Sequence, residues 1–94
     1  MDAVVDELLA PAALSKLRWR CRRGLLENDL FIERFFARYA DRLTLRQAVG
    51  LEALMELADN DLLDLLFARV QPEATLDRPE VRLVLEQLRA RAAA

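Results

Sequence analysis

The 94-residue sequence has no histidine, one cysteine, one lysine and two glycines. Without histidine the chain cannot build imidazole-based metal sites or histidine-dependent catalytic triads. A single cysteine cannot form an internal disulfide, which fits a reducing compartment. The isolated glycines, Gly24 and Gly50, provide no glycine-rich loop for a phosphate or a dinucleotide. These absences disfavour catalysis by this chain alone and a self-sufficient dinucleotide site.

Strand-forming residues are also scarce, whereas the helix formers Leu, Ala, Arg and Glu dominate. The chain is 54% hydrophobic and 32% charged, with a net charge of −2. These values are typical of a packed domain, and the length allows only one. The sequence therefore predicts a small all-α domain over residues 1–94, a five-helix bundle. Residues 1–10 either extend a helix or form a loose lead, and the alanine tail at 92–94 frays.

The beginning of the chain resembles no targeting segment. Asp2, Asp6 and Glu7 are acidic and the first ten residues contain no base, unlike a signal or transit peptide. No apolar run approaches the roughly 20 residues that a membrane helix needs. We therefore expect no membrane insertion and a cytoplasmic location.

Local signals predict the bounds of the first three helices. The first is expected over 11–22, opened by a proline whose missing N–H costs nothing there. The second is expected over 26–39. Thr44 followed by Gln47 forms a capping-box pattern, so the third should begin at Leu45.

Similar signals predict the last two helices. Asp59 or Asn60 is expected to cap the fourth helix, which a Gln-Pro pair ends at Pro72. A loop follows, and Asp77 with Pro79 opens the fifth helix.

Apolar residues at helical spacing define the expected buried faces. These positions are Leu14, Leu17, Cys21, Leu25, Leu26, Leu30, Ile32, Phe35, Phe36, Tyr39, Leu51, Leu54, Met55, Ala58, Leu63, Leu66, Phe67, Val70, Val81, Val84, Leu85 and Leu88. Four of the six aromatic residues lie in 26–39, so we expect this to be the central buried helix. Gly50 is expected to let a neighbouring helix approach closely.

The most informative stretch runs from Trp19 to Asp29, and we call it the signature segment. It holds the only tryptophan and the only cysteine, and the acids Glu27 and Asp29 follow its dense arginine run. One interpretation is purely structural. In this interpretation the arginines lie near the negative C-terminal end of the first helix, and Gly24 closes that helix. The acids lie near the positive N-terminal end of the second helix.

The pattern W-x-C-R-R-G-x-x-E-x-D in this segment resembles the signature of the SdhE (YgfY-like) family of succinate dehydrogenase flavinylation factors. In mitochondria the family is called succinate dehydrogenase assembly factor 2. Its hallmark R-G-x-x-E is similar to Arg23 through Glu27 here. The family's Phe-Phe pair and acidic turn match Phe35-Phe36 and 59–62, with Asn60 where many relatives carry proline. Many relatives also carry a tryptophan in the next helix, where this chain has leucine. The resemblance covers roughly residues 14–70.

This resemblance implies an assembly factor and not an enzyme. Family members bind the flavoprotein subunit of succinate dehydrogenase, and in some bacteria that of fumarate reductase, and promote covalent attachment of FAD to it. The flavoprotein and the flavin carry out the chemistry, so the resemblance implies no tightly bound cofactor on this chain. The factor's implied role is to hold the immature subunit in a competent arrangement.

By motif position, the resemblance places partner contacts at six residues of the signature segment. The contact core is Arg23, Gly24 and Glu27, and the flanking contacts are Arg22, Trp19 and Asp29. Each also has a structural interpretation: Trp19 could pack between the first two helices, Glu27 could serve only as a helix N-terminal acid, and Gly24 only as a cap.

Two other function classes remain open from the residues. Residues 18–23 form a basic segment that includes Trp19. Such a segment could bind nucleic acid, so the alternative function is a small antitoxin- or regulator-like module. However, Arg18 and Arg20 point about 200° apart on a helix, and the acids that follow would repel phosphate. For catalysis, Cys21 has cations nearby but no general base beside it, and a lone cysteine in a helix is more often a small core residue.

Overall fold

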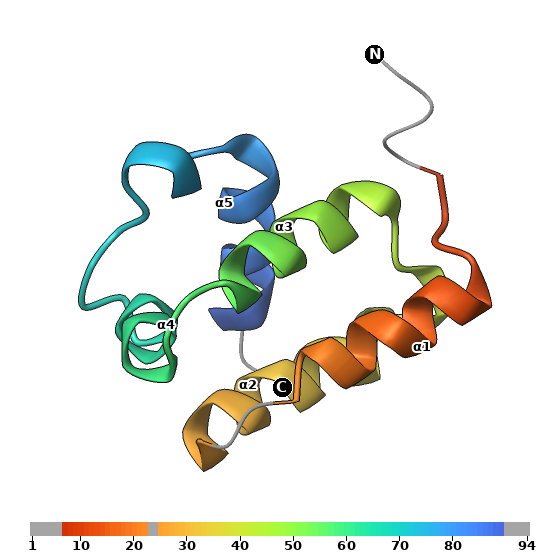
Figure 1. The fold of residues 1–94 in the computed structure, drawn as a ribbon, viewed down its shortest axis with the longest axis horizontal. Helices are drawn as coiled ribbons and strands as arrows, with labels where there is room; N and C mark the ends of the chain where they lie inside the picture. The colour runs from red at the N-terminus through yellow and green to blue at the C-terminus, as the bar shows by residue number, and fades with distance from the viewer. Residues whose placement is uncertain (1–6, 23–24, 90–94) are drawn as a thin grey trace.

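The computed structural model describes residues 7–22 and 25–89. In these residues the chain forms five α-helices, as predicted, and no strand (Figure 1). The helices are α1 (Pro11–Arg20), α2 (Leu26–Tyr39), α3 (Leu45–Met55), α4 (Asp59–Leu66) and α5 (Pro79–Arg89), with 3-10 turns η2 (Ala40–Arg42) and η3 (Ala74–Leu76). The all-α expectation is confirmed.

Helices α3 and α5 cross at the centre of the molecule (Figure 1). Gly50 makes this contact possible, because a Cβ there would lie 2.9 Å from the carbonyl carbon of Glu80 and from Val84 Cγ2. Such distances are shorter than van der Waals contact, so any side chain at this position would push the helices apart. The expected close approach at Gly50 is therefore confirmed.

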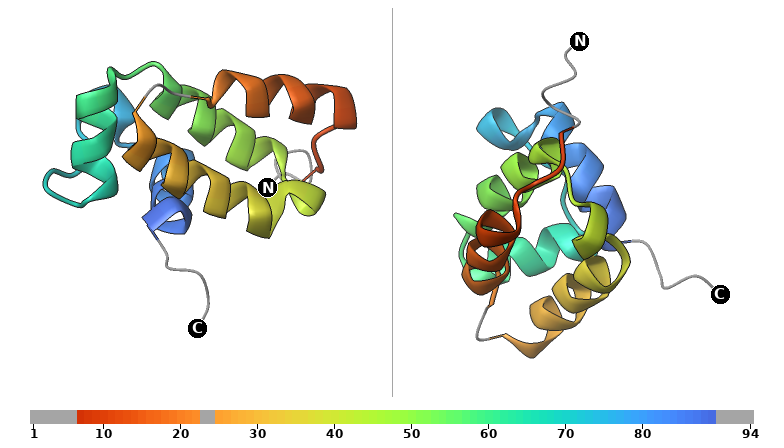
Figure 2. Two further views of the ribbon diagram at one scale, coloured as in Figure 1. Left: turned by 90° about the horizontal axis from the view of Figure 1, so that it is seen from below. Right: turned by 90° about the vertical axis from the view of Figure 1, so that its right-hand side faces the viewer.

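Helix α2 packs on α4 and α5. Its bounds are those predicted, and Ile32, Phe35 and Phe36 are buried in the common core, as expected. The four expected core residues of α5 are also buried. Helices α1 and α2 run in opposite directions in both Figure 1 and the left view of Figure 2.

The capping box that begins α3 is confirmed. The Gln47 backbone N–H donates to Thr44 Oγ1 at 3.2 Å, and the Thr44 N–H donates to Gln47 Oε1 at 2.9 Å. The segment before α1 is tied to the same place. Leu9 N–H donates to the Leu43 carbonyl at 2.7 Å and Leu45 N–H to the Glu7 carbonyl at 2.8 Å. Residues 7–9 therefore form an antiparallel bridge and do not extend α1.

Helix α1 ends at Arg20, two residues before the predicted end. Cys21 is the C-cap and is buried, and its N–H reaches the carbonyls of both Leu17 and Arg18. The Arg22 N–H bonds to the Trp19 carbonyl three residues back. This tightening of the last turn satisfies the terminal carbonyls but stops the α-helical hydrogen-bond series.

Helix α4 differs most from the prediction. It begins at Asp59 after Ala58, which has no side-chain cap, so neither Asp59 nor Asn60 is the N-cap. It ends at Leu66, well before Pro72, because Ala68 has a φ of 59° and reverses the chain.

The α4 terminus has the hydrogen bonds of a Schellman motif. Arg69 N–H donates to the Asp64 carbonyl at 2.8 Å and Ala68 N–H to the Leu65 carbonyl at 3.0 Å. Glycine is the usual residue at this position, so an alanine there gave no stop signal in the sequence.

Several expected core residues lie at the surface. Leu26, Leu30, Ala58, Phe67 and Val70 are exposed, and Leu63 and Leu25 are only half-buried. In α4 the buried residues are Leu62, Leu65 and Leu66, so the buried face lies one residue, or about 100° around the helix, from the predicted one. The helix is only eight residues long, so an early stop changes which residues pack inward.

Candidate functional site

A groove of about 770 Å³ opens between α1 and α2. Its lining residues are Ser15, Arg18, Trp19, Arg22, Asp29, Glu33, Phe36 and Ala37. Three of them, Trp19, Arg22 and Asp29, are residues that the sequence predicts as partner contacts. The fold thus brings together residues from both helical ends of the signature segment.

The two walls of the groove carry opposite charges. Arg18 and Arg22 come from the α1 side, and Asp29 and Glu33 from α2. Each arginine lies over an aromatic ring: the Arg22 guanidinium carbon is 5.2 Å from the Trp19 ring centroid, and that of Arg18 is 5.2 Å from Phe36. Such cation–π stacking holds the guanidinium plane in place while leaving its N–H groups available to a ligand.

Trp19 is 72% exposed. It therefore does not pack between α1 and α2, the structural interpretation that the sequence left open. Tryptophan and arginine are among the residue types enriched at the energetic centres of protein interfaces. The groove is accordingly a surface suited to bind a protein rather than a small apolar molecule.

Arg18 and Arg20 do not share one basic face. Arg20 points away from the groove and its Nη2 pairs with Glu56 Oε2 at 3.3 Å, at the end of α3. Arg18 lies in the groove over Phe36. The separation that helical geometry predicts for these two residues is therefore observed, and it weakens the nucleic-acid interpretation.

Glu27 lies apart from the groove. It is exposed in the first turn of α2, and it is separated from Asp29 by about 200° around the helix axis. Its negative charge is placed favourably near the positive N-terminal end of α2. Arg23 and Gly24, the other two residues of the predicted contact core, lie outside the described residues.

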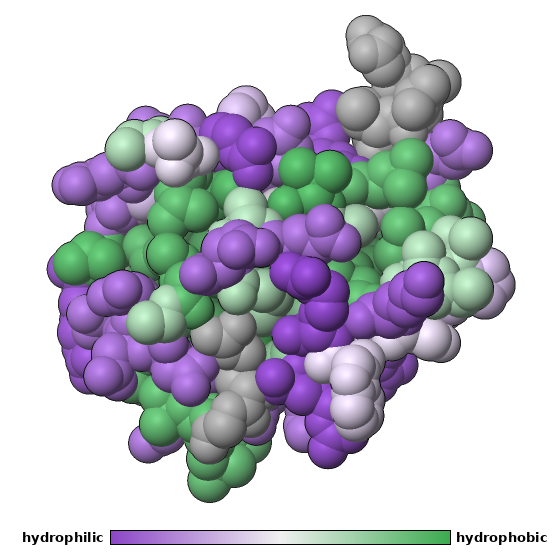
Figure 3. Space-filling model, viewed as in Figure 1, coloured by the Kyte–Doolittle hydropathy of each residue, from purple (hydrophilic) through white to green (hydrophobic). Residues whose placement is uncertain are grey.

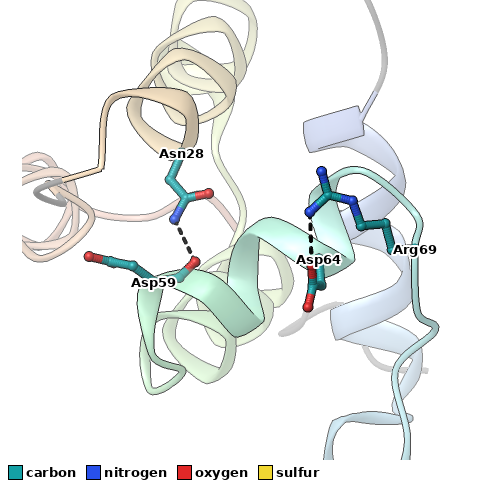
Figure 4. Close-up of polar contacts among 4 residues, drawn as sticks. All are labelled: Asn28, Asp59, Asp64 and Arg69. Atoms are coloured by element: carbon teal, nitrogen blue, oxygen red, sulfur yellow. Dashed lines mark hydrogen bonds and ion pairs between the residues drawn. The ribbon is translucent and has the colours of Figure 1, made fainter.

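Asn28 is a residue that the sequence analysis missed. Its side chain is fully buried, and Nδ2 donates to the Asp59 carbonyl at 3.0 Å, as Figure 4 shows. This bond joins the signature segment to the first residue of α4. The available signal was its position four residues before Ile32, on the buried face of α2, where a polar residue needs a partner.

In the described part of the chain, no three Cys, Asp or Glu side chains gather in a way that could hold a metal ion. None of the helices described is both long and apolar enough to span a bilayer.

The fold and the groove define a class: small all-helical proteins whose polar, aromatic surface suits a protein partner. Residues 15–92 match the protein family described as "Flavinator of succinate dehydrogenase", and the chain belongs to that family. The match extends beyond the resemblance at roughly 14–70 and takes in α5. No solved structure gave a significant match.

Curated relatives support this assignment, and each is named FAD assembly factor SdhE. The one from Ralstonia nicotianae is 56% identical over 80 residues, covering 85% of this chain and 84% of the relative. The one from Coxiella burnetii is 35% identical over 74 residues, covering 79% and 90%. The one from Acetobacter pasteurianus is 32% identical over 91 residues, covering 96% and 83%.

Proposed function

We propose that this protein is an FAD assembly factor of succinate dehydrogenase, which binds the flavoprotein subunit and promotes covalent attachment of FAD to it. Family membership supports the kind of partner. The observation that carries the proposal on this chain is the meeting of Trp19, Arg22 and Asp29 in one exposed groove. We extend the proposal to the flavoprotein subunit of fumarate reductase where the host has one.

The groove suits recognition of a folded polar surface. Arg22 offers planar donors to carboxylates and carbonyls of the partner, and Asp29 and Glu33 on the other wall accept from its donors. Opposite charges facing each other across one groove fix the orientation of the bound segment, because a reversed segment would meet like charge.

Binding of this kind assists the reaction by a population shift. A factor that binds the attachment-competent conformer of the subunit more tightly than others raises its population by that difference in affinity. This role requires no reacting group on the factor, so we propose that the chain itself is not an enzyme and holds no FAD tightly. We place it in the cytoplasm, where its single thiol stays reduced.

A reconstitution tests the proposal. The protein is mixed with the apo-flavoprotein subunit, FAD and a dicarboxylate, and covalent flavin is read by its fluorescence on a denaturing gel. We expect faster covalent incorporation, abolished by Gly24→Arg with the helical circular dichroism retained. Glu27→Ala should fold normally and give weaker support. Equilibrium dialysis of FAD against the factor alone should show no retention.

One outcome would count against the proposed function, and another would assign Gly24 to the fold alone. If the wild-type protein forms no complex and gives no acceleration, the assembly function is wrong. If Gly24→Arg loses its helical signal, Gly24 acts as a helix cap and its loss of function carries no information about the interface.

A further inference from the structure

The outward face of α2 carries an apolar surface beside the groove. Leu26 is 68% and Leu30 51% exposed on this helix, and Phe67, which follows α4, is 47% exposed. Half-buried Phe31 joins the two helices at this surface. We call these four residues the α2 ridge. In Figure 3, apolar surface gathers at the lower edge of the molecule, where Figure 1 places the first turn of α2.

The aromatic part of the α2 ridge is held in a fixed arrangement. Phe31 and Phe67 pack edge to face, with ring centroids 5.5 Å apart and planes at 86°. The Arg34 guanidinium lies 5.1 Å from the Phe31 centroid, and that of Arg69 lies 5.0 Å from the Phe67 centroid. Arg69 is further held by Asp64 at 3.0 Å (Figure 4). Preorganised rings and guanidinium groups lose little side-chain entropy on binding.

The signature acid Glu27 lies within this surface. Leu30 and Phe31 follow it by three and four residues and are therefore its neighbours along the helix face. Arg34 continues the same face one turn further on. The α2 ridge is thus continuous with the residue that the family signature contributes on this side of α2, just as the groove is continuous with Asp29.

We propose that the α2 ridge is a second docking surface for the same flavoprotein partner, and this inference rests on the proposed function. The matching segment of the partner is amphipathic. Its apolar side chains cover Leu26 and Leu30, and a carboxylate faces Arg34. Exposed leucines beside aromatic rings and arginines match the composition of an interface core with a polar rim. The factor then grips its partner on both sides of the first turn of α2.

Two variants of Leu30 with opposite charges separate this inference from simple electrostatics. Binding to the immobilised apo-flavoprotein is measured for wild type, Leu30→Glu and Leu30→Lys. Val49→Glu is the matched control, because Val49 is similarly exposed, at 45%, on α3. We expect both Leu30 variants to bind at least about tenfold more weakly with unchanged thermal unfolding, and the control to bind as wild type.

The outcomes distinguish failure of the α2 ridge as a docking surface from failure of the proposed function. If wild type does not bind, the proposed function fails and this inference with it. If wild type binds, Gly24→Arg does not, and both Leu30 variants bind normally, the α2 ridge is not a docking surface while the proposed function stands. If Leu30→Glu instead abolishes self-association in sedimentation velocity and leaves flavoprotein binding unchanged, the ridge joins two copies of this chain and the inference is wrong.

Discussion

At the scale of single residues, exposure separates binding from packing. Trp19 and Phe36 both line the groove, but Phe36 is buried in the core while Trp19 stands in solvent. A large aromatic side chain that gains so little burial within its own chain contributes little to folding. Its contribution is expected on binding, together with Arg22 stacked beside it.

Trp19→Ala should therefore weaken partner binding without destabilising the protein. We expect a loss of about 2 kcal/mol in binding, or roughly 30-fold in Kd, and a change within about 0.5 kcal/mol in the free energy of unfolding. Titration calorimetry and urea unfolding measure the two quantities. Trp19→Phe should recover most of the affinity; unchanged affinity in Trp19→Ala would remove Trp19 from the interface.

Gly50 is the opposite case, a residue whose role is entirely in the fold. Gly50→Ala would gain helix propensity, but its Cβ would strike the Glu80 backbone. Because the obstacle is backbone rather than a flexible side-chain end, the clash dominates, and we expect the protein to lose about 1–3 kcal/mol of stability. Chemical denaturation followed by circular dichroism measures this loss. The neighbouring exposed Val49→Ala should change stability by less than about 0.5 kcal/mol; a stabilised Gly50→Ala would contradict the close approach of α3 and α5.

At the scale of elements, short helices depend most on their ends. The C-terminus of α4 places Ala68 in the left-handed region, with a φ of 59°. That conformation costs a non-glycine residue roughly 1–2 kcal/mol. The cost is offset by the Schellman hydrogen bonds and by the burial of Leu62, Leu65 and Leu66.

Ala68→Gly should consequently stabilise the protein. We expect a gain of about 1 kcal/mol, seen as a rise in Tm of roughly 4–8 °C for a domain of this size. Differential scanning calorimetry measures the shift. Ala12→Gly, at an exposed site in α1, serves as a control and should lower Tm because glycine is unfavourable within a helix. An equal fall in both variants would show that Ala68 does not adopt the left-handed conformation in solution.

At the scale of the whole molecule, charge distribution decides which partners are favoured. The net charge is −2, and among the described arginines Arg18 and Arg22 line the groove whereas Arg20 pairs with Glu56. The acids Asp29 and Glu33 also line the groove. Residues 7–22 and 25–89 therefore present no continuous basic surface that would match a phosphate backbone.

We therefore expect no appreciable binding to nucleic acid. Fluorescence anisotropy with labelled duplex DNA or RNA should show no saturable binding below about 100 μM protein at 150 mM salt, whereas non-specific binders reach Kd values of 10⁻⁴–10⁻⁶ M. A lysine- and arginine-rich helical protein of similar size provides the positive control. Binding whose log K falls with log salt concentration, with a slope that corresponds to release of several counterions, would support the nucleic-acid alternative.

The sequence by itself determined the helical class, the bounds of α2, the start of α3 and the family. These depend on local features: the helical repeat of apolar residues, the Thr44–Gln47 capping box and the spacing within the signature segment. Only the tertiary structure decided which apolar residues are covered. Leu26 and Leu30 fit a helical core pattern as well as Ile32 does, but the neighbouring helices cover only one face of α2.

The coverage of α2 on one face also explains why the signature residues lie on two separate surfaces. Glu27 and Asp29 are two residues apart in sequence, yet the rotation of the helix directs Asp29 to the α1 groove and leaves Glu27 on the α2 ridge. Asn28, between them, is buried, and its side chain donates to a carbonyl group that α4 supplies. Local spacing identified the signature, whereas the groove between α1 and α2 and the packing of α4 on α2 separated its residues into two surfaces and the buried Asn28.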